Sequence, residues 1–291
     1  MKETNSKPQI WMCYSYKGGS GRTVASGNIA AALAKQGKQV LIIDMDIEAP
    51  GLQNLFEVTE TEKYRNKKGL QDYLKKHISI EELDEFAIIN LSDKEDVTDP
   101  LIIPNDGSLR YLIATNRSTN VMTEMSNLPE RMESLVNYFA EKYDLDYIVL
   151  DAASGIREAF TIALHVTDLL LVFFRWTRQH LEGTIKVGTL IETMQDIGET
   201  ERLKAFKLIA SAAPQEEDLQ GLQDKVLAGA LTKVKNDSIA RLEEELEESG
   251  TLFHEIPEMI ELKWRERILA LDRKNTPYEQ IVARLIKEYG C

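Results

Sequence analysis

The residues best suited to chemistry lie near the start of the chain, in a glycine-rich loop that reads YSYKGGSGRT from Tyr14 to Thr23. The apolar residues 9–13 before it are typical of a buried strand, and the Ala-rich residues 24–36 after it predict a helix. Glycines let successive backbone N–H groups point inward, and a helix N-terminus adds positive potential. The order of strand, loop and helix therefore predicts phosphate binding, with the Thr23 hydroxyl on a phosphate-bound Mg²⁺. A glycine turn that binds nothing is the competing interpretation.

Carboxylates follow two further predicted strands. Asp44 and Asp46 come directly after the apolar residues 39–43, and Asp151 ends a second apolar run. Open α/β sheets bind their ligands beyond the carboxyl ends of the strands. These carboxylates are therefore predicted to lie beside the glycine loop, where Asp151 would hold Mg²⁺ through water. The alternative is a strand-end aspartate that only caps the following turn.

Three motifs in order resemble a known family. The early lysine, Lys17, gives the pattern K-G-G-x-G-R-T, which resembles the deviant Walker A loop of the ParA/MinD family of P-loop ATPases. The stretch from Asp44 to Gly51 resembles that family's switch I, and Asp151 with Gly155 resembles its Walker B strand and switch II. The resemblance implies an α/β fold of the SIMIBI class of P-loop NTPases. It has a single doubly wound, mostly parallel sheet flanked by helices.

The resemblance also implies a role for each of these residues. Lys17 would reach across an ATP-sandwiched homodimer to the partner's nucleotide, Asp46 would orient the attacking water, and Gly155 would let switch II respond to the γ-phosphate. Arg22 takes the place of the usual lysine before the threonine, and its planar fork keeps the positive charge. The implied nucleotide ligands are Lys17, Gly18, Gly19, Ser20, Gly21, Arg22, Thr23, Val24 and Pro257. The implied Mg²⁺ ligands are Thr23, Asp44 and Asp151, and the implied catalytic residues are Lys17, Arg22 and Asp46.

Later segments concern the base pocket and the dimer face. Ile256-Pro257 resembles the pair that borders the base pocket in relatives, but the strand at 206–210 lacks the Asn that many relatives use there, so base specificity stays open. The strand at 168–174 leads into a helix expected at 181–197, which the resemblance places at the dimer face. Arg175 and Arg178 suit contacts with phosphate or the opposing subunit, or ordinary surface positions.

Composition narrows the classes of protein. The 291 residues are 43% apolar and 29% charged, as in soluble globular proteins. The net charge of −13 argues against a surface that coats nucleic acid or anionic lipid, although a local basic patch is possible. Two cysteines without a C-x-x-C pair exclude the iron–sulfur branches of the family. Without a signal-peptide pattern or an apolar run longer than residues 169–174, we expect a cytoplasmic protein with no stable membrane insertion.

No break in composition divides the chain, so residues 1–291 are predicted to form one P-loop ATPase domain. Residues 57–107 are expected to be a variable insertion, with short helices at 69–77 and 80–86. Residues 258–291 are expected to form two closing helices, at 262–271 and 277–289, the second packing onto the sheet. The four histidines show no metal-ligand spacing.

The favoured function is a slowly hydrolysing Mg·ATP-dependent ATPase that forms a nucleotide-sandwich dimer and switches the binding of an unknown protein partner. Because Arg22 replaces the loop lysine, a non-hydrolysing scaffold or sensor subunit of a larger assembly is the alternative. A DNA-partition or positioning ATPase is disfavoured by the net charge. A metabolic kinase or synthetase would need a substrate pocket that no sequence feature reveals.

Overall fold

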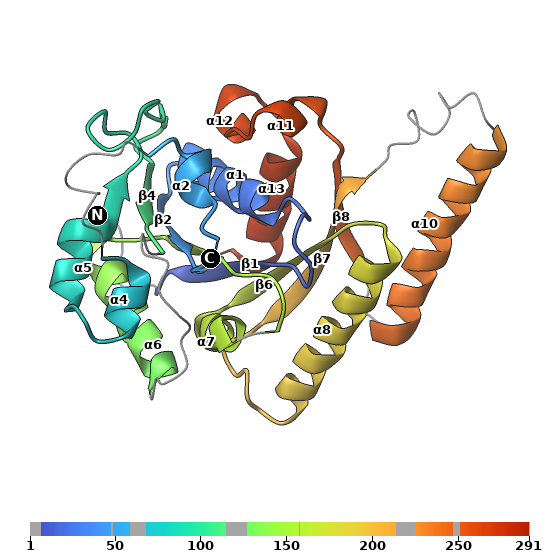
Figure 1. Cartoon of the computed structure of the whole chain (residues 1–291), viewed down its shortest axis with the longest axis horizontal. Helices are drawn as coiled ribbons and strands as arrows, with labels where there is room; N and C mark the ends of the chain where they lie inside the picture. Colours follow the sequence, from blue (N-terminus) through green and yellow to red (C-terminus); the bar gives the residue numbers. More distant parts are fainter. Residues whose placement is uncertain are drawn as a thin grey trace.

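A central sheet organises the chain, described here from a computed structural model that covers residues 7–47, 49–58, 68–114, 127–156, 158–213, 225–246 and 251–290 (Figure 1). Its eight strands are ordered β3-β4-β2-β5-β1-β6-β7-β8. The strands are β1 (Gln9–Tyr14), β2 (Gln39–Asp44), β3 (Ile88–Asn90), β4 (Ser108–Leu112), β5 (Tyr147–Asp151), β6 (Leu169–Phe174), β7 (Ala205–Ala213) and β8 (Leu252–Pro257). Only the edge pair β3 and β4 is antiparallel among these strands. The predicted doubly wound, mostly parallel sheet is confirmed.

Helices cover both faces of this sheet (Figure 1). One layer holds α1 (Arg22–Lys35), α2 (Leu52–Leu55), α11 (Ile260–Trp264), α12 (Leu269–Asp272) and α13 (Pro277–Tyr289). The other holds α4 (Leu70–Leu74), α5 (Ile80–Ala87), α6 (Leu128–Tyr143), α7 (Glu158–Val166), α8 (Arg178–Asp196) and α10 (Lys225–Leu246). The last helix, α13, packs on the sheet side as expected, burying Ile281, Val282 and Leu285.

Alternate residues of β1 enter two separate cores. Ile10, Met12 and Tyr14 pack in the core beneath α6 to α8, whereas Trp11 and Cys13 pack beneath α1. All five side chains are fully buried. Successive side chains of a strand point to opposite faces, so a strand covered on both faces needs an uninterrupted apolar run. This is why β1 carries no polar alternation and lies at the centre of the sheet.

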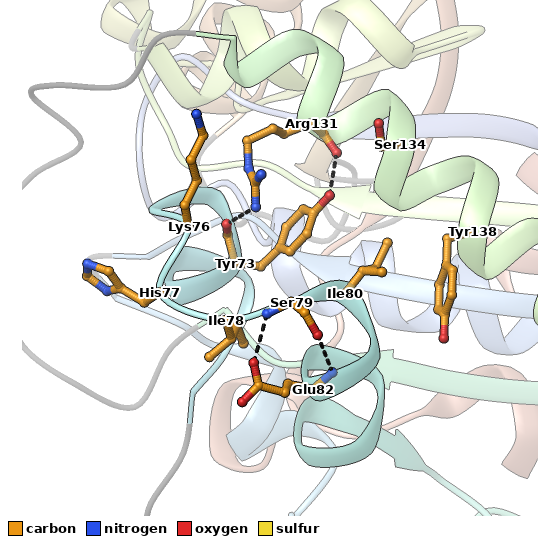
Figure 2. A pocket seen from close by; sticks show the side chains of 10 residues that line it. All are labelled: Tyr73, Lys76, His77, Ile78, Ser79, Ile80, Glu82, Arg131, Ser134 and Tyr138. Carbon is orange, nitrogen blue, oxygen red and sulfur yellow. Dashed lines mark hydrogen bonds between the residues drawn. The ribbon is translucent and has the colours of Figure 1, made fainter.

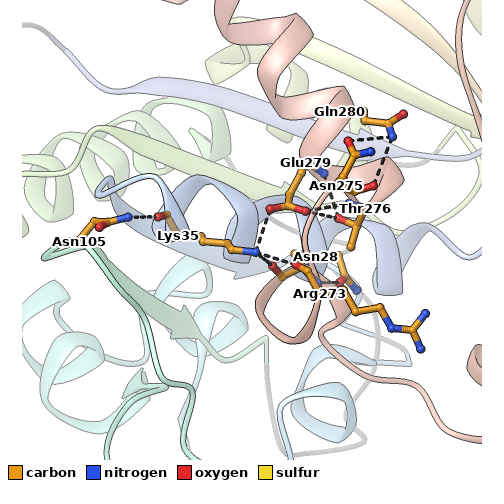
Figure 3. Close-up of polar contacts among 9 residues, drawn as sticks. Asn28, Lys35, Asn105, Arg273, Asn275, Thr276, Glu279 and Gln280 are labelled. Carbon is orange, nitrogen blue, oxygen red and sulfur yellow. Dashed lines mark hydrogen bonds and ion pairs between the residues drawn. The ribbon is translucent and has the colours of Figure 1, made fainter.

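Polar contacts of Lys35, the last residue of α1, hold the C-terminal helices against that helix (Figure 3). The Nζ of Lys35 donates to the carbonyl oxygens of Ala270 and Arg273, each at 2.7 Å, and to the Glu279 carboxylate at 2.9 Å. Glu279 also accepts from the backbone N–H of Thr276, which caps α13. The helix that follows the glycine loop is thereby tied to the end of the chain.

The single helix expected at 262–271 is wrong. Two short helices, α11 and α12, are separated there by extended residues. The buried side chain of Asn28, in α1, donates to the carbonyl oxygen of Arg267 and accepts from the backbone N–H of Ala270, both at 3.0 Å. A continuous helix would use those backbone groups internally, so the Asn28 contacts stabilise the break.

Three elements had no prediction, the three-residue strand β3 and the helices α2 and α7. All three are short, and none provides enough residues for a clear periodicity. Residues 59–67 of the expected insertion lie outside the described part of the chain. Within the ranges given above, no helix is both long and apolar enough to cross a membrane.

Candidate nucleotide-binding site

The predicted carboxylates converge where the central strands end. β2 and β5 pair so that Asp44 lies beside Asp151, and Cys13 of β1 lies on the other side of Asp151. Both aspartates are fully buried. Because parallel strands end on one edge, the glycine loop after β1 and the two acidic motifs meet there despite their separation in sequence.

The glycine loop has the conformation that its sequence requires. Gly19 and Gly21 have φ values of +78° and +75°, in the left-handed region that favours glycine. Gly21 directly precedes α1. A Cβ on Gly18, Gly19 or Gly21 would meet no atom within 4 Å, so there is open space over the loop. Backbone N–H groups and a helix N-terminus beside such space suit an anion.

Lys17 is exposed at this edge. Its Nζ lies 5.9 Å from the centre of the Tyr16 ring. The Tyr16 ring in turn covers Gly183 of α8, where an added Cβ would lie 2.0 Å from the ring. The helix expected at the dimer face therefore supports the residue before Lys17. This contact could not be predicted from the sequence, because a mid-helix glycine does not specify which side chain covers it.

Arg22 binds the acidic motifs. Its Nε donates to Oδ1 of Asp151 at 2.8 Å, and one terminal nitrogen lies 3.4 Å from both Asp46 Oδ2 and Thr23 Oγ1. Burial lowers the pKa of the Arg22 guanidinium, but the charge of Asp151, the hydrogen bond to it, and the charges of Asp46 and Asp44 together raise that pKa above its ordinary value. Arg22 is therefore a buried cation that joins the glycine loop to the expected switch I and to the end of β5.

Two buried carboxylates, those of Asp44 and Asp151, lie at this edge beside the cation Arg22. Burial raises the pKa of Asp44 well above its ordinary value, and the neighbouring Asp151 raises it further, against hydrogen bonds from the N–H groups of Asp46 and Leu52. Burial also raises the pKa of Asp151, while Arg22 opposes that change. This edge can therefore accept more positive charge than Arg22 supplies.

The residues at this edge suit a magnesium ion that is held jointly by protein side chains and by the phosphates of a bound nucleotide. Asp151 Oδ2 is buried without a hydrogen-bond partner among the described residues. Switch I packs against Thr23, because a Cβ on Gly51 would lie 2.9 Å from the Thr23 methyl group. No three His, Cys, Asp or Glu side chains in the described ranges could hold a metal on their own. Mg²⁺ is commonly held by one or two protein groups together with substrate phosphates, as this arrangement allows.

A cavity of about 330 Å³ opens beside the loop. Gly19, Gly21 and Val24 line one side of it and Pro257 another. Ser211 and Ala212, at the end of β7, also line it, together with Arg175, Glu258, Met259, Leu262 and Tyr278. Arg178 is instead a surface residue paired with Glu182. The sequence pointed to Pro257 and Arg175, but the wall from α11 and α13 depends on how the C-terminal helices fold back.

Gly155 connects the second switch to the loop. Its φ is +84°, and its N–H donates to the carbonyl oxygen of Ser15 at 3.3 Å. Displacing switch II would therefore break a direct contact with the segment that carries Lys17. The expected switch glycine thus lies against the expected phosphate loop.

A second pocket, of about 580 Å³, lies between α4, α5 and α6 (Figure 2). It contains none of the predicted site residues. Its principal cation, Arg131, stacks on the Tyr73 ring at 4.2 Å and donates to the Tyr73 carbonyl oxygen, while the Tyr73 hydroxyl donates to the Arg131 carbonyl oxygen. These contacts hold α4 against α6. The pocket is therefore part of the packing of these helices and is separate from the candidate nucleotide site.

Fold and site together define a P-loop nucleotide-binding protein. A family model described as an AAA domain matches residues 9–205. An uncharacterised ATP-binding protein of Methanocaldococcus jannaschii is 32% identical over 160 residues, which cover 54% of this chain and 49% of that protein. The septum site-determining protein MinD of Synechocystis is 26% identical over 264 residues, covering 87% of this chain and 89% of that protein. The match therefore spans about half of the first relative and most of the second.

Solved structures share the fold. The ATP complex of a McdA variant from Cyanothece has a TM-score of 0.65 at 15% identity, with 98% of both chains covered. MinD of Pyrococcus horikoshii, complexed with Mg-ADP, has a TM-score of 0.61 at 18% identity, covering 97% of this chain and 95% of that one. The chain belongs to the ParA/MinD family of P-loop ATPases.

Proposed function

We propose that this protein is an Mg·ATP-dependent switch that hydrolyses ATP slowly, forms a homodimer around two nucleotides, and changes its affinity for a protein partner with the nucleotide state. The observation that carries this proposal is the contact of Arg22 with Asp151 and Asp46 beside the open glycine loop. It connects the phosphate loop to the expected switch I and to the strand that leads into the expected switch II. A change at the phosphates can therefore reach both segments through Arg22 and through the contact between Gly155 and Ser15.

In this proposal each residue has a task that suits its position. The loop N–H groups and Arg22 bind phosphate, and Thr23, Asp44 and Asp151 hold Mg²⁺, the aspartates through water. When bound, Mg²⁺ would neutralise charge on the phosphates. Asp46, which is partly exposed beside Arg22, orients water. The exposed Lys17 is free of the buried acid cluster and suits a contact with the partner subunit's nucleotide.

The first test measures ATP hydrolysis by the purified protein with Mg²⁺, together with its mass in solution without nucleotide, with ADP and with ATP. We expect slow turnover and a dimer that depends on ATP. Magnesium removal by a chelator should abolish turnover. A protein that binds no ATP, or that binds it without any change in mass or turnover, would contradict the proposal.

A second candidate, a non-hydrolysing nucleotide-dependent scaffold or sensor, is favoured by the same arginine. The acidic groups at the site already hold the Arg22 guanidinium, and its planar fork cannot reproduce a lysine point charge on phosphate. ATP binding and dimerisation without turnover would support this candidate. Salt-dependent retention of DNA by the dimer would instead support a partition ATPase.

A further inference from the structure

The first part of α10 extends beyond the body of the protein (Figure 1). The deepest contacts of α10 lie near its end, where Leu242 and Leu246 are buried. Lys235 makes a 2.7 Å ion pair with Glu255, near the carboxyl end of β8. At 1.5 Å per residue, the ten residues before Lys235 continue for about 15 Å past this contact.

The neighbouring helix α8 does not reach the first ten residues of α10. Leu246 packs on Gly188, where an added Cβ would lie 2.6 Å from the leucine. Closer to the start of both helices, Arg241 acts on Glu182, whose pKa is lowered mainly by Arg178 and further by Arg241. The two helices therefore run parallel, and α8 begins at Arg178, level with about residue 237 of α10. Residues 225–234, which we call the α10 arm, lie beyond it.

The arm carries an apolar stripe. Leu227, Leu231 and Val234 occupy one side of the helix at the spacing i, i+4, i+7. They are 47%, 41% and 53% exposed. At 3.6 residues per turn, the stripe lies next to the side of the helix on which Leu242 and Leu246 are buried against α8. An exposed apolar stripe of this kind marks an interaction surface.

The charge of the arm differs from that of the chain. Lys225 and Lys233 lie on it, and it contains no acidic residue, whereas Lys235, which follows the arm, is already paired with Glu255. The whole chain carries −13, so the remainder is more negative still. Two such chains repel each other when they approach, and a basic, apolar arm reaching over the other chain offsets that repulsion.

The arm extends from the edge that holds the nucleotide site. β7 ends at Ala213, which neighbours the cavity residue Ala212, and α10 is the next described element of the chain. At the same edge α11 exposes Ile260 by 69% and Trp264 by 87%. A second copy brought to this edge by nucleotide thus offers apolar side chains to the arm.

We infer that the α10 arm packs against a second copy of this chain and strengthens the nucleotide-dependent dimer. The inference rests on the proposed function, because nucleotide is what brings the two carboxyl edges together. Under two-fold symmetry each subunit contributes one arm, so the contact is made twice.

The test compares dimer dissociation constants with Mg²⁺ and a non-hydrolysable ATP analogue, which separates assembly from turnover. The double variant Leu231→Glu/Val234→Glu keeps good helix formers and should weaken the dimer about tenfold or more. Thr232→Glu/Asn236→Glu adds the same charge away from the stripe and should dimerise like the wild type. Leu231→Met/Val234→Ile keeps the stripe apolar and should also do so. Circular dichroism and nucleotide affinity confirm that each variant is folded.

The outcomes separate this inference from the proposed function. If the wild type dimerises and the stripe variant dimerises equally well, the arm contact is overturned while the dimeric switch stands. If both glutamate pairs weaken the dimer equally, charge and not the stripe is responsible, and the inference fails. If the stripe variant loses only retention on DNA, the arm is a nucleic-acid surface. A wild type that stays monomeric with nucleotide overturns both.

Discussion

At the residue scale, Arg22 differs from its surroundings in being a nearly buried cation held by acids from two different motifs. Such a pair is weak evidence of net stabilisation, because removing charges from water costs free energy. Removing one member of the pair is strongly destabilising, since the remaining charge is left buried without a partner. The residue should therefore be needed for the stability of the nucleotide-free protein as well as for phosphate binding.

Arg22→Ala should lower the free energy of unfolding by about 3 kcal/mol at neutral pH, because Asp151 is left buried without its cation. The loss should shrink in acid. Without Arg22 the pKa of Asp151 in the folded state rises further, so the variant loses stability as pH rises from about 4, the unfolded value, toward the raised folded value. Urea unfolding at several pH values measures this. Arg178→Ala removes an exposed arginine and should change stability far less than Arg22→Ala; equal effects of both variants would show that the buried contact is unimportant.

Lys17→Ala should leave stability within about 0.5 kcal/mol of the wild type, since the side chain is exposed. Some nucleotide affinity should remain, whereas ATP-driven dimerisation or hydrolysis should be abolished. Unfolding, nucleotide titration and mass measurements check the three statements, with the distant exposed Lys94→Ala as control. Normal turnover together with normal dimerisation would remove Lys17 from the site.

Asp46→Ala should stop hydrolysis and accumulate an ATP-bound dimer, because the water-orienting carboxylate is lost. Asp46 also accepts from the backbone N–H of Ala49 at 3.1 Å, so the alanine variant disturbs switch I as well. Asp46→Asn keeps an acceptor for that bond and removes the charge. Single-turnover hydrolysis should be slow in both variants. Fast hydrolysis by either would exclude Asp46 as the water-positioning residue.

At the scale of elements, the sequence was most informative where local pattern and fold agree. The loop, the strands that end in aspartate and the long helix after β6 were all predicted, because buried parallel strands are continuous apolar runs bounded by recognisable turns. The place of the candidate site at the carboxyl ends of the strands could therefore be predicted from the sequence. The unpredicted parts depend on distant contacts: Tyr16 on Gly183 supports the loop, and Asn28 reaches residues more than two hundred positions later.

Asn28 explains why periodicity failed at 262–271. The apolar spacing there fits one helix, but a side chain from α1 binds the backbone groups at its centre. Nothing near residue 267 in the sequence indicates such a partner. The break separates α12 from α11, whose Leu262 lines the cavity beside the glycine loop. A local misprediction thus concealed part of the site.

Asn28→Ala should lower the free energy of unfolding by about 2 kcal/mol, because the partly buried carbonyl of Arg267 and the buried N–H of Ala270 lose their partner. Nucleotide affinity should also fall, since the segment that follows the α11 wall of the cavity loses its contact with α1. Urea unfolding and nucleotide titration measure both effects, with the exposed Asn236→Ala as the matched control. A stable variant with normal affinity would show that α11 and α12 hold their positions by apolar packing alone.

At the scale of the whole molecule, the carboxyl ends and the amino ends of the parallel strands have different roles. The carboxyl edge gathers the loop, the switches, the cavity and the α10 arm. At the amino edge, the chain is closed by a hydrogen bond at 2.5 Å from the side chain of Gln9, at the start of β1, to the carbonyl oxygen of Tyr289, at the end of α13. The first strand and the last helix therefore meet on the side away from the nucleotide.

This closure has a practical consequence. A tether or fluorescent domain joined beside Gln9 or beside Tyr289 would leave the molecule from the same side. A surface that holds the protein by either attachment would present the carboxyl edge outward. Two molecules anchored on opposing surfaces would then meet through their nucleotide sites, whereas molecules anchored on one surface would have to tilt to do so.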